Sequence, residues 1–228
     1  MNKRILFIAL IFIGLISSGR AQEKAFRFGF KVAPNIGWIK PNSEGYIRDE
    51  IKSGFAWGFI GDIHLIENYW FHTGFNVDFI RGAYHYQHKI DTLIGTLNRK
   101  LSSKYIQVPL VFKMKTNEIN SIRYYGEIGF GLGFLFDAKA ADSFTKDQVL
   151  ITPETSKTDV KNQYRFTRES LILGAGLEFS PGGDLLIQTG LRFDNNFIDI
   201  LKDQNSVDSS IEQMAISNFV ELQISLLF

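Results

Sequence analysis

The stretch Ile216-Ser-Asn-Phe-Val-Glu-Leu-Gln-Ile-Ser-Leu-Leu-Phe228 indicates the fold, because its side chains alternate in character with a period of two. One row is entirely apolar and consists of Val220, Leu222, Ile224, Leu226 and Phe228. The other row is more polar and consists of Phe219, Glu221, Gln223, Ser225 and Leu227. Successive side chains of a β-strand point to opposite faces, so this stretch is predicted to be a strand with two different environments.

The same alternation recurs in seven further stretches. These predicted strands span about residues 26–39, 53–65, 69–81 (extending to 85 at most), 104–115, 122–137, 165–179 and 184–197. The polar connections 40–52, 86–103, 138–164 and 198–215 are long, and they alternate with the short connections 66–68, 117–120 and 180–183. An even number of strands with this rhythm is typical of barrels that span the bacterial outer membrane. We therefore predict an all-β fold, an eight-stranded antiparallel up-and-down transmembrane β-barrel formed by residues 22–228, with extracellular long loops and periplasmic termini.

The two faces of these strands predict where lipid lies. One face is almost wholly Phe, Leu, Ile and Val, and the chain holds 21 Phe. The opposite face carries the charged residues Arg27, Lys31, Asp62, Asp78, Lys113, Glu127, Glu178, Arg192, Asp194 and Glu221. A soluble barrel would bury its apolar face instead, so charges on the inner face favour a membrane protein. Because eight strands leave room inside only for side chains, we expect a plugged interior cross-linked by ion pairs, without a diffusion pore.

The N-terminus indicates export. Lys3 and Arg4 precede an apolar run over residues 5–16, and small residues follow up to Ala21. This order is typical of a secretory signal peptide, which would comprise residues 1–21 with cleavage between Ala21 and Gln22. The alternative interpretation is an uncleaved N-terminal anchor. The sequence contains no Cys, so we expect neither disulfides nor a lipid-anchored cysteine.

Charge and glycine patterns exclude two classes of function. The chain has 25 Lys and Arg against 24 Asp and Glu, and removal of residues 1–21 leaves 22 against 24. A net charge of −2 argues against nucleic acid as a partner. The glycines Gly129, Gly131 and Gly133 share one face of a predicted strand and precede no helix, so they do not form a nucleotide loop. We expect no cofactor.

Two features resemble known outer-membrane proteins. A final strand that ends in Phe228 is similar to the closing strands that the outer-membrane barrel-insertion machinery recognises, with Leu222, Ile224 and Leu226 completing the signal. Tyr-Ile-Gln-Val-Pro-Leu-Val-Phe-Lys at 105–113, followed by Tyr-Gly-Glu-Ile-Gly-Phe-Gly-Leu-Gly at 125–133, resembles the PorT family of Bacteroidota. This resemblance implies an outer-membrane location and links to type IX secretion or gliding, with secretion-apparatus proteins as partners.

The histidines are the candidates for chemistry. His64 and His72 flank one short turn, but no third ligand is fixed by spacing, so we expect no metal site. His85 and His88 lie at the start of the predicted loop 86–103, and Ser102 and Ser103 lie at its end, so the two pairs could approach each other. A lipid-modifying enzyme with a rim active site is therefore the alternative function. Without a nucleophile motif or a residue that would orient the base, we expect a non-enzymatic protein.

The long loops are the remaining candidates for function. Residues 138–164 and 198–215 are polar and of mixed charge, and loops on a rigid scaffold commonly carry binding function. The sequence therefore predicts a docking or structural role, with outer-membrane lipids and lipopolysaccharide around the barrel.

Overall fold

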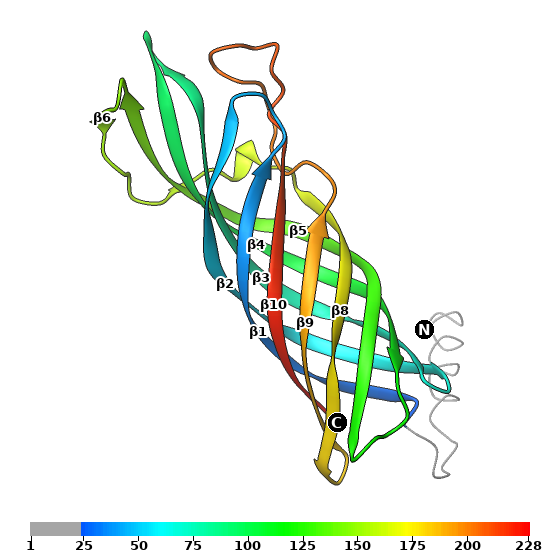
Figure 1. The fold of residues 1–228 in the computed structure, drawn as a ribbon. Coiled ribbons are helices and arrows are strands. Elements are labelled where there is room, and N and C mark those ends of the chain that lie inside the picture. The colour runs from blue at the N-terminus through cyan, green and yellow to red at the C-terminus, as the bar shows by residue number, and fades with distance from the viewer. Residues whose placement is uncertain (1–23) are drawn as a thin grey trace, which may run out of the picture.

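The computed structural model describes residues 24–228, which form a closed antiparallel β-barrel (Figure 1). Eight strands make up its ring: β1 (Phe26–Pro41), β2 (Tyr46–Ile66), β3 (Tyr69–Ile90), β4 (Leu93–Lys115), β5 (Ile122–Lys146), β8 (Thr167–Gly182), β9 (Leu185–Asn196) and β10 (Ala215–Leu227). Each strand pairs with its neighbours along the chain, and β1 closes the ring by pairing with β10. The predicted fold class is confirmed.

Three small elements lie outside the ring. The strands β6 (Val149–Thr152) and β7 (Thr158–Asp159) pair with β5, and η1 (Lys161–Gln163) is a single turn of 3₁₀ helix. Within residues 24–228, no helix has the length and apolar character that crossing a bilayer would require. The predicted signal peptide and its cleavage site between Ala21 and Gln22 fall outside the described residues.

The outer surface of the ring is apolar. Phe28, Phe30 and Phe130 are each more than half exposed, because their strands alternate between outward and inward side chains. The predicted insertion residues Leu222, Ile224, Leu226 and Phe228 also face outward. An apolar outer face is stable in lipid and costly in water, so this band marks the part of the barrel that lies in the membrane.

The two ends of the barrel differ. At one end, called the short-turn end, the chain reverses at 67–68, 116–121 and 183–184. At the other, called the extended end, the hairpins β3–β4 and β5–β6 project well beyond the ring (Figure 1). Both Lys24 and Phe228 lie at the short-turn end, since β1 and β10 pair there through Gly29 and Leu227.

The predicted long loops 40–52 and 86–103, and the first part of 138–164, are wrong. Strand β2 already begins at Tyr46, the hairpin β3–β4 turns only between Ile90 and Leu93, and β5 continues to Lys146. Inward positions on these extensions are occupied by Tyr46, Tyr86 and other side chains that a hydropathy pattern scores as polar. Alternation of inward and outward side chains therefore continues in the structure beyond the point where the hydropathy pattern stops.

A hydrophobic core fills the extended end. Its buried members are Ile39, Tyr46, Ile80, Tyr84, Tyr86, Leu97, Leu101, Tyr105, Leu135, Ala138, Ala140, Phe144, Val160, Tyr164, Ile200, Leu201, Ala215 and Phe219. Tyr46 stacks on Tyr86 with ring centroids 4.5 Å apart, and the hydroxyls of Tyr84 and Tyr164 lie 2.9 Å apart. The segments around Tyr164 and Ile200 fold over the opening, so this end of the lumen is closed by packed side chains.

Candidate functional site

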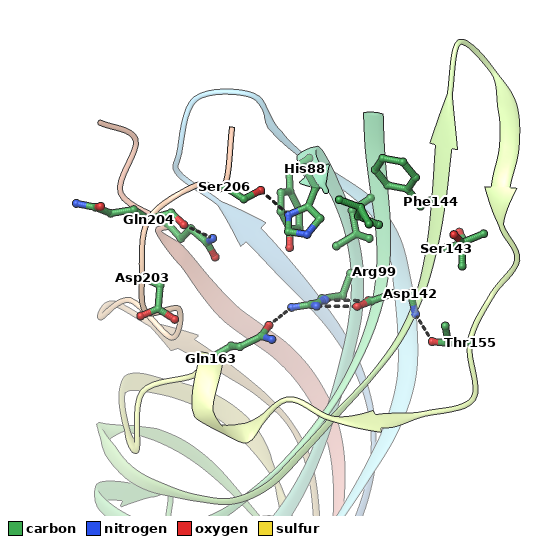
Figure 2. Close-up of a pocket in the computed structure, with 15 residues that line it drawn as sticks. His88, Arg99, Asp142, Ser143, Phe144, Thr155, Gln163, Asp203, Gln204 and Ser206 are labelled. Atoms are coloured by element: carbon green, nitrogen blue, oxygen red, sulfur yellow. Dashed lines mark hydrogen bonds and ion pairs between the residues drawn. The ribbon is translucent and has the colours of Figure 1, made fainter. Parts of the chain in front are cut away.

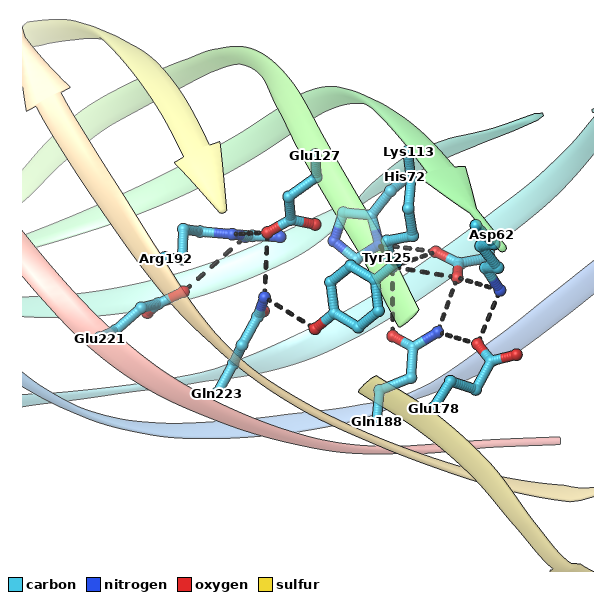
Figure 3. A network of polar contacts seen from close by, with 11 residues as sticks. Asp62, His72, Lys113, Tyr125, Glu127, Glu178, Gln188, Arg192, Glu221 and Gln223 are labelled. Carbon is cyan, nitrogen blue, oxygen red and sulfur yellow. Dashed lines mark hydrogen bonds and ion pairs between the residues drawn. The ribbon is translucent and has the colours of Figure 1, made fainter. Parts of the chain in front are cut away.

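The half of the lumen nearer the short turns is filled by a polar network centred on Asp62 (Figure 3). Its carboxylate lies 2.6 Å from Nδ1 of His72, and Nζ of Lys113 donates to it at 3.2 Å. The carboxamide of Gln188 donates to Asp62 at 3.1 Å and to Glu178 at 2.6 Å. Because β2, β4 and β9 are not all neighbours, these contacts tie separate walls of the barrel across the lumen.

A second cluster lies further along the lumen, around Glu127 and Glu221. The guanidinium of Arg192 donates to Glu127 at 2.8 Å, and Nζ of Lys31 donates to Glu221 at 2.7 Å. Gln223 on β10 also reaches Glu127 on β5, at 3.0 Å. Breaking a buried ion pair by removing one partner typically costs about 3–5 kcal/mol, so these contacts hold the walls together.

A third cluster joins the polar network to the core at the extended end. The Arg168 guanidinium pairs with Asp194 and donates to the hydroxyl and carbonyl of Ser217. Gln107 on β4 donates to the other oxygen of Asp194 at 2.8 Å, across the lumen. The Arg168 guanidinium also lies 5.3 Å from the ring centre of Phe219, a member of the core at the extended end.

The structure brings most of the predicted inner residues together. Seven of the ten predicted charges take part in the first two clusters, and an eighth, Asp194, is held by Arg168 in the third. Arg27 is half-buried at the short-turn end, where its guanidinium lies 6.0 Å from the ring centre of Trp70. Asp78 is buried, and no cation of the described residues lies within ion-pair distance of it.

Sequence reasoning missed Arg168 and the two amides Gln107 and Gln188. Arg168 lies near the start of β8, beside the predicted loop, where alternation alone does not fix the register. It shares a face with Ser170, Ile172 and Gly174, and that row was the signal that could have identified it. Amides were missed because the prediction considered charge alone.

The histidine pair His64 and His72 does not converge on one point. Nδ1 of His72 is occupied by Asp62, whereas Nε2 of His64 lies 2.8 Å from the backbone carbonyl of Glu67. Strand pairing places Asp62 opposite His72 and Trp70 opposite His64, so the two histidines face different neighbours. No cluster of three or more His, Asp or Glu side chains suited to a metal ion occurs in residues 24–228.

The predicted rim pairing of His85 or His88 with Ser102 or Ser103 is wrong. In the hairpin β3–β4, His85 pairs with Asn98 and His88 with Gly95, whereas Ser102 pairs with Arg81. Four or more strand positions separate the serines from the histidines, and each position adds about 3.3 Å. The hypothesis treated these residues as opposite limbs of one flexible loop, but they belong to paired strands.

The extended end instead contains a different site, a cavity of about 400 Å³ called the Arg99 cavity (Figure 2). It is lined by Tyr86, His88, Ile90, Leu97, Arg99, Asp142, Ser143, Phe144, Thr152, Thr155, Gln163, Asp203, Gln204, Ser206 and Gln213. These residues come from β3, β4, β5, the segment 152–163 and the loop 203–213, which are far apart in sequence. Its volume lies within the range of about 300–1,000 Å³ that is usual for ligand pockets.

Arg99 is fixed at the base of this cavity. Its Nε and Nη2 donate to the two carboxylate oxygens of Asp142 at 2.8 and 2.6 Å, and Nη1 donates to Gln163 at 2.5 Å (Figure 2). A bidentate arginine–carboxylate pair has strict geometry, so the guanidinium has little freedom to move. Burial raises the pKa of the neighbouring Tyr164 to about 12, which keeps this tyrosine neutral.

His88 and Ser206 fasten the loop 203–213 to β3. The Ser206 hydroxyl lies 2.7 Å from Nδ1 of His88 and accepts a hydrogen bond from the Lys89 backbone N–H at 3.0 Å. Burial lowers the pKa of His88 below its usual value of 6.5, and the Arg99 charge lowers it further. His88 is therefore neutral at pH 7, and its Nδ1 can accept a hydrogen bond from the Ser206 hydroxyl.

Comparison with protein families identifies the class of the chain. Residues 20–202 match the model of the outer membrane protein β-barrel domain family. The chain belongs to this family. It is an outer-membrane barrel protein, in agreement with the apolar band around its strands. Comparison with curated proteins finds no match.

Several solved structures of other outer-membrane proteins are similar to the chain at low identity. Neisserial surface protein A is 12% identical, with a TM-score of 0.43, and the match covers 90% of this chain and 98% of that chain. Ail of Yersinia pestis, in complex with the heparin analogue sucrose octasulfate, is 13% identical with a TM-score of 0.36, over 89% and 99% of the two chains. OprG of Pseudomonas aeruginosa is 9% identical with a TM-score of 0.37, over 89% and 95%.

Proposed function

We propose that this protein is a non-enzymatic outer-membrane barrel, closed to diffusion, whose extended end lies outside the cell and docks partners. The observation that carries the proposal is the filling of the lumen. Buried ion pairs such as Lys31–Glu221 occupy one part, and the core around Tyr84 and Tyr164 occupies the extended end. A polar solute would have to break several of these contacts to pass.

The projecting hairpins support the docking role. Their tips expose the aliphatic side chains Ile90, Leu93, Ile94, Val149, Leu150 and Ile151 beyond the membrane band. The hairpins are held rigid below these tips, since β4 and β5 remain paired as far as Thr96 and Thr145. Apolar groups on a rigid support outside the membrane favour binding to another macromolecule.

Conductance and surface labelling test the two halves of the proposal. The purified barrel in a planar lipid bilayer should give no steady ion current, and a stable open channel would contradict closure.

An epitope tag inserted at Asp147, in the β5–β6 turn, should be accessible to antibody on intact cells. A tag at Gly183, in the β8–β9 turn, should become accessible only after the cells are opened. The reverse pattern would contradict the orientation.

The resemblance of residues 105–113 and 125–133 to the PorT family extends the proposal to secretion. A barrel of that kind would serve as a docking component of type IX secretion or gliding. Photo-crosslinkers at Ile94 and Leu150 in living cells should then capture components of the secretion apparatus. Normal secretion and gliding in a deletion strain would remove this part of the proposal and leave the closed docking barrel intact.

A lipid-modifying enzyme remains the second candidate, because Ser206 and His88 lie 2.7 Å apart. They are the one Ser–His pair at hydrogen-bond distance within residues 24–228. A fluorophosphonate probe that labels Ser206, together with an altered lipid acyl pattern in a deletion strain, would favour this function. Absence of both results supports the non-enzymatic role.

A further inference from the structure

The lining of the Arg99 cavity has a consistent chemical character. Three Gln side chains and four Ser or Thr hydroxyls surround it, together with the carboxylates of Asp142 and Asp203. Aliphatic and aromatic carbon is confined to Ile90, Leu97, Phe144 and Tyr86. The lining therefore combines apolar carbon with many hydrogen-bonding groups, and a purely hydrocarbon ligand would displace water from those groups without replacing its hydrogen bonds.

The charges of the cavity do not suit an anion. Arg99 is the only permanent cation among the lining residues, and both oxygens of Asp142 neutralise it. His88 is neutral at pH 7, since burial lowers its pKa. Asp203 therefore leaves the cavity with an excess of negative charge, which opposes phosphate, sulfate and carboxylate groups.

Several polar groups of the cavity still have hydrogen-bonding capacity. Gln163 uses its Oε1 for Arg99, and Gln213 uses its Nε2 for the carbonyl of Gln204. The side chains of Gln204 and Asp203 make no hydrogen bond to other residues in the described part of the chain. Donors and acceptors thus both line the cavity, and a hydroxyl group can use either because it donates and accepts at once.

The walls of the cavity are ordered before any ligand arrives. Asn205 donates to the Tyr46 hydroxyl at 3.1 Å and to the Gln87 carbonyl at 3.2 Å, and Ser206 is held by His88. The loop 203–213 is therefore tied to β2 and β3. A preformed site loses less conformational entropy on binding, which favours recognition of a small ligand.

We propose that the Arg99 cavity binds a neutral saccharide, whose hydroxyls pair with Gln163, Gln204 and Asp203. A saccharide combines adjacent hydroxyl groups with an uncharged ring, which matches both the polar groups and the electrostatics of the cavity. This binding function goes beyond the docking role of the hairpin tips, and it uses different residues.

The test is titration calorimetry on the full-length barrel, purified in detergent and freed of lipopolysaccharide. One probe is the delipidated, dephosphorylated oligosaccharide of the lipopolysaccharide of the producing cell, and a second is a panel of neutral oligosaccharides from other cells. A sulfated heparin oligosaccharide is the anionic control. Binding of the first probe identifies the membrane's own glycan as the source, and binding of the second alone identifies a foreign glycan. Binding of neither, or of the sulfated probe alone, overturns the proposal.

Variants locate the site. Gln204→Ala and Gln163→Ala should each weaken binding of the neutral probe by about tenfold, since each removes hydrogen-bonding groups from the cavity. Gln87→Ala is the matched control, because Gln87 lies on the same strand as His88 and is exposed on the opposite face. Unchanged affinity in the Gln163→Ala, Gln204→Ala double variant would overturn the proposal. Capture of a protein by the hairpin tips would be unaffected by these variants, so the two functions fail independently.

Discussion

Nζ of Lys31 lies 2.7 Å from Oε1 of Glu221, and this ion pair joins the first strand of the barrel to the last. Both side chains are 1% exposed. Arg192 approaches the same glutamate at 3.8 Å, so Glu221 is shared by cations from both of its neighbouring strands. The seam between β1 and β10 is thus held by charge in addition to the backbone ladder.

Removal of one partner at this seam should destabilise the barrel. In Glu221→Leu the charge of Lys31 would remain buried without its carboxylate, and such a loss typically costs about 3–5 kcal/mol. Urea unfolding of the barrel in detergent, followed by the gel-mobility difference between folded and unfolded forms, measures the change. The double variant Lys31→Met, Glu221→Leu should recover much of the stability. Lys40→Met is the control, since Lys40 is exposed on the same strand.

Gly129 and Gly126 on β5 should respond differently to the same substitution. A Cβ on Gly129 would lie 2.2 Å from the Leu110 carbonyl oxygen, a backbone atom that cannot rotate away. A Cβ on Gly126 would meet no atom within 4 Å. Gly129→Ala should therefore lower the free energy of unfolding by about 1–3 kcal/mol, as overpacking does in other cores. Gly126→Ala should leave it nearly unchanged, and equal effects would contradict the close approach of β4 and β5.

Phe228 should matter for assembly more than for the stability of the assembled barrel. Its ring faces outward and lies 6.1 Å from that of Phe28, and its N–H donates to the Phe28 carbonyl at 2.8 Å. If the final strand acts as an insertion signal, deletion of Phe228 should reduce the folded barrel in outer-membrane fractions severalfold. Phe197→Ala, at an exposed phenylalanine beyond β9, is the control. Normal insertion of the truncated chain would contradict the signal role.

The alternation of residues such as Glu221 and Leu222 was sufficient to predict the ring, because a strand between lipid and a polar lumen must alternate strictly. The projecting hairpins escaped prediction because Tyr86 and His88 have polar atoms yet pack inward. A tyrosine in a core keeps its ring buried and needs only one partner for its hydroxyl, as the Tyr84–Tyr164 contact shows.

The Arg99 cavity could not be predicted from sequence patterns. Ser206 and His88 are 118 residues apart, and Arg99 and Gln163 are 64 apart. Their approach depends on how the segments 152–163 and 203–213 fold over the hairpin, and these segments have no periodicity to read. Charge spacing predicted which residues face the lumen. The partner of each charge, however, can be assigned only when the strand register and the positions of the amides Gln107 and Gln188 are known.

The attachment of loop 203–213 should weaken in acid. Burial lowers the pKa of His88 below its value of 6.5 in the open chain, so the attached loop favours the neutral imidazole. The contribution of neutral His88 to the stability of the attached loop is complete above pH 6.5. It decreases as the pH falls below 6.5 toward the lowered pKa of the attached state. Protonated Nδ1 can no longer accept the hydrogen bond from Ser206. Hydrogen exchange of residues 203–213 should therefore be faster at pH 5 than at pH 7.5, after correction for intrinsic rates. His88→Asn should remove this dependence, and His85→Asn should preserve it, because Asp49 holds His85 away from the loop.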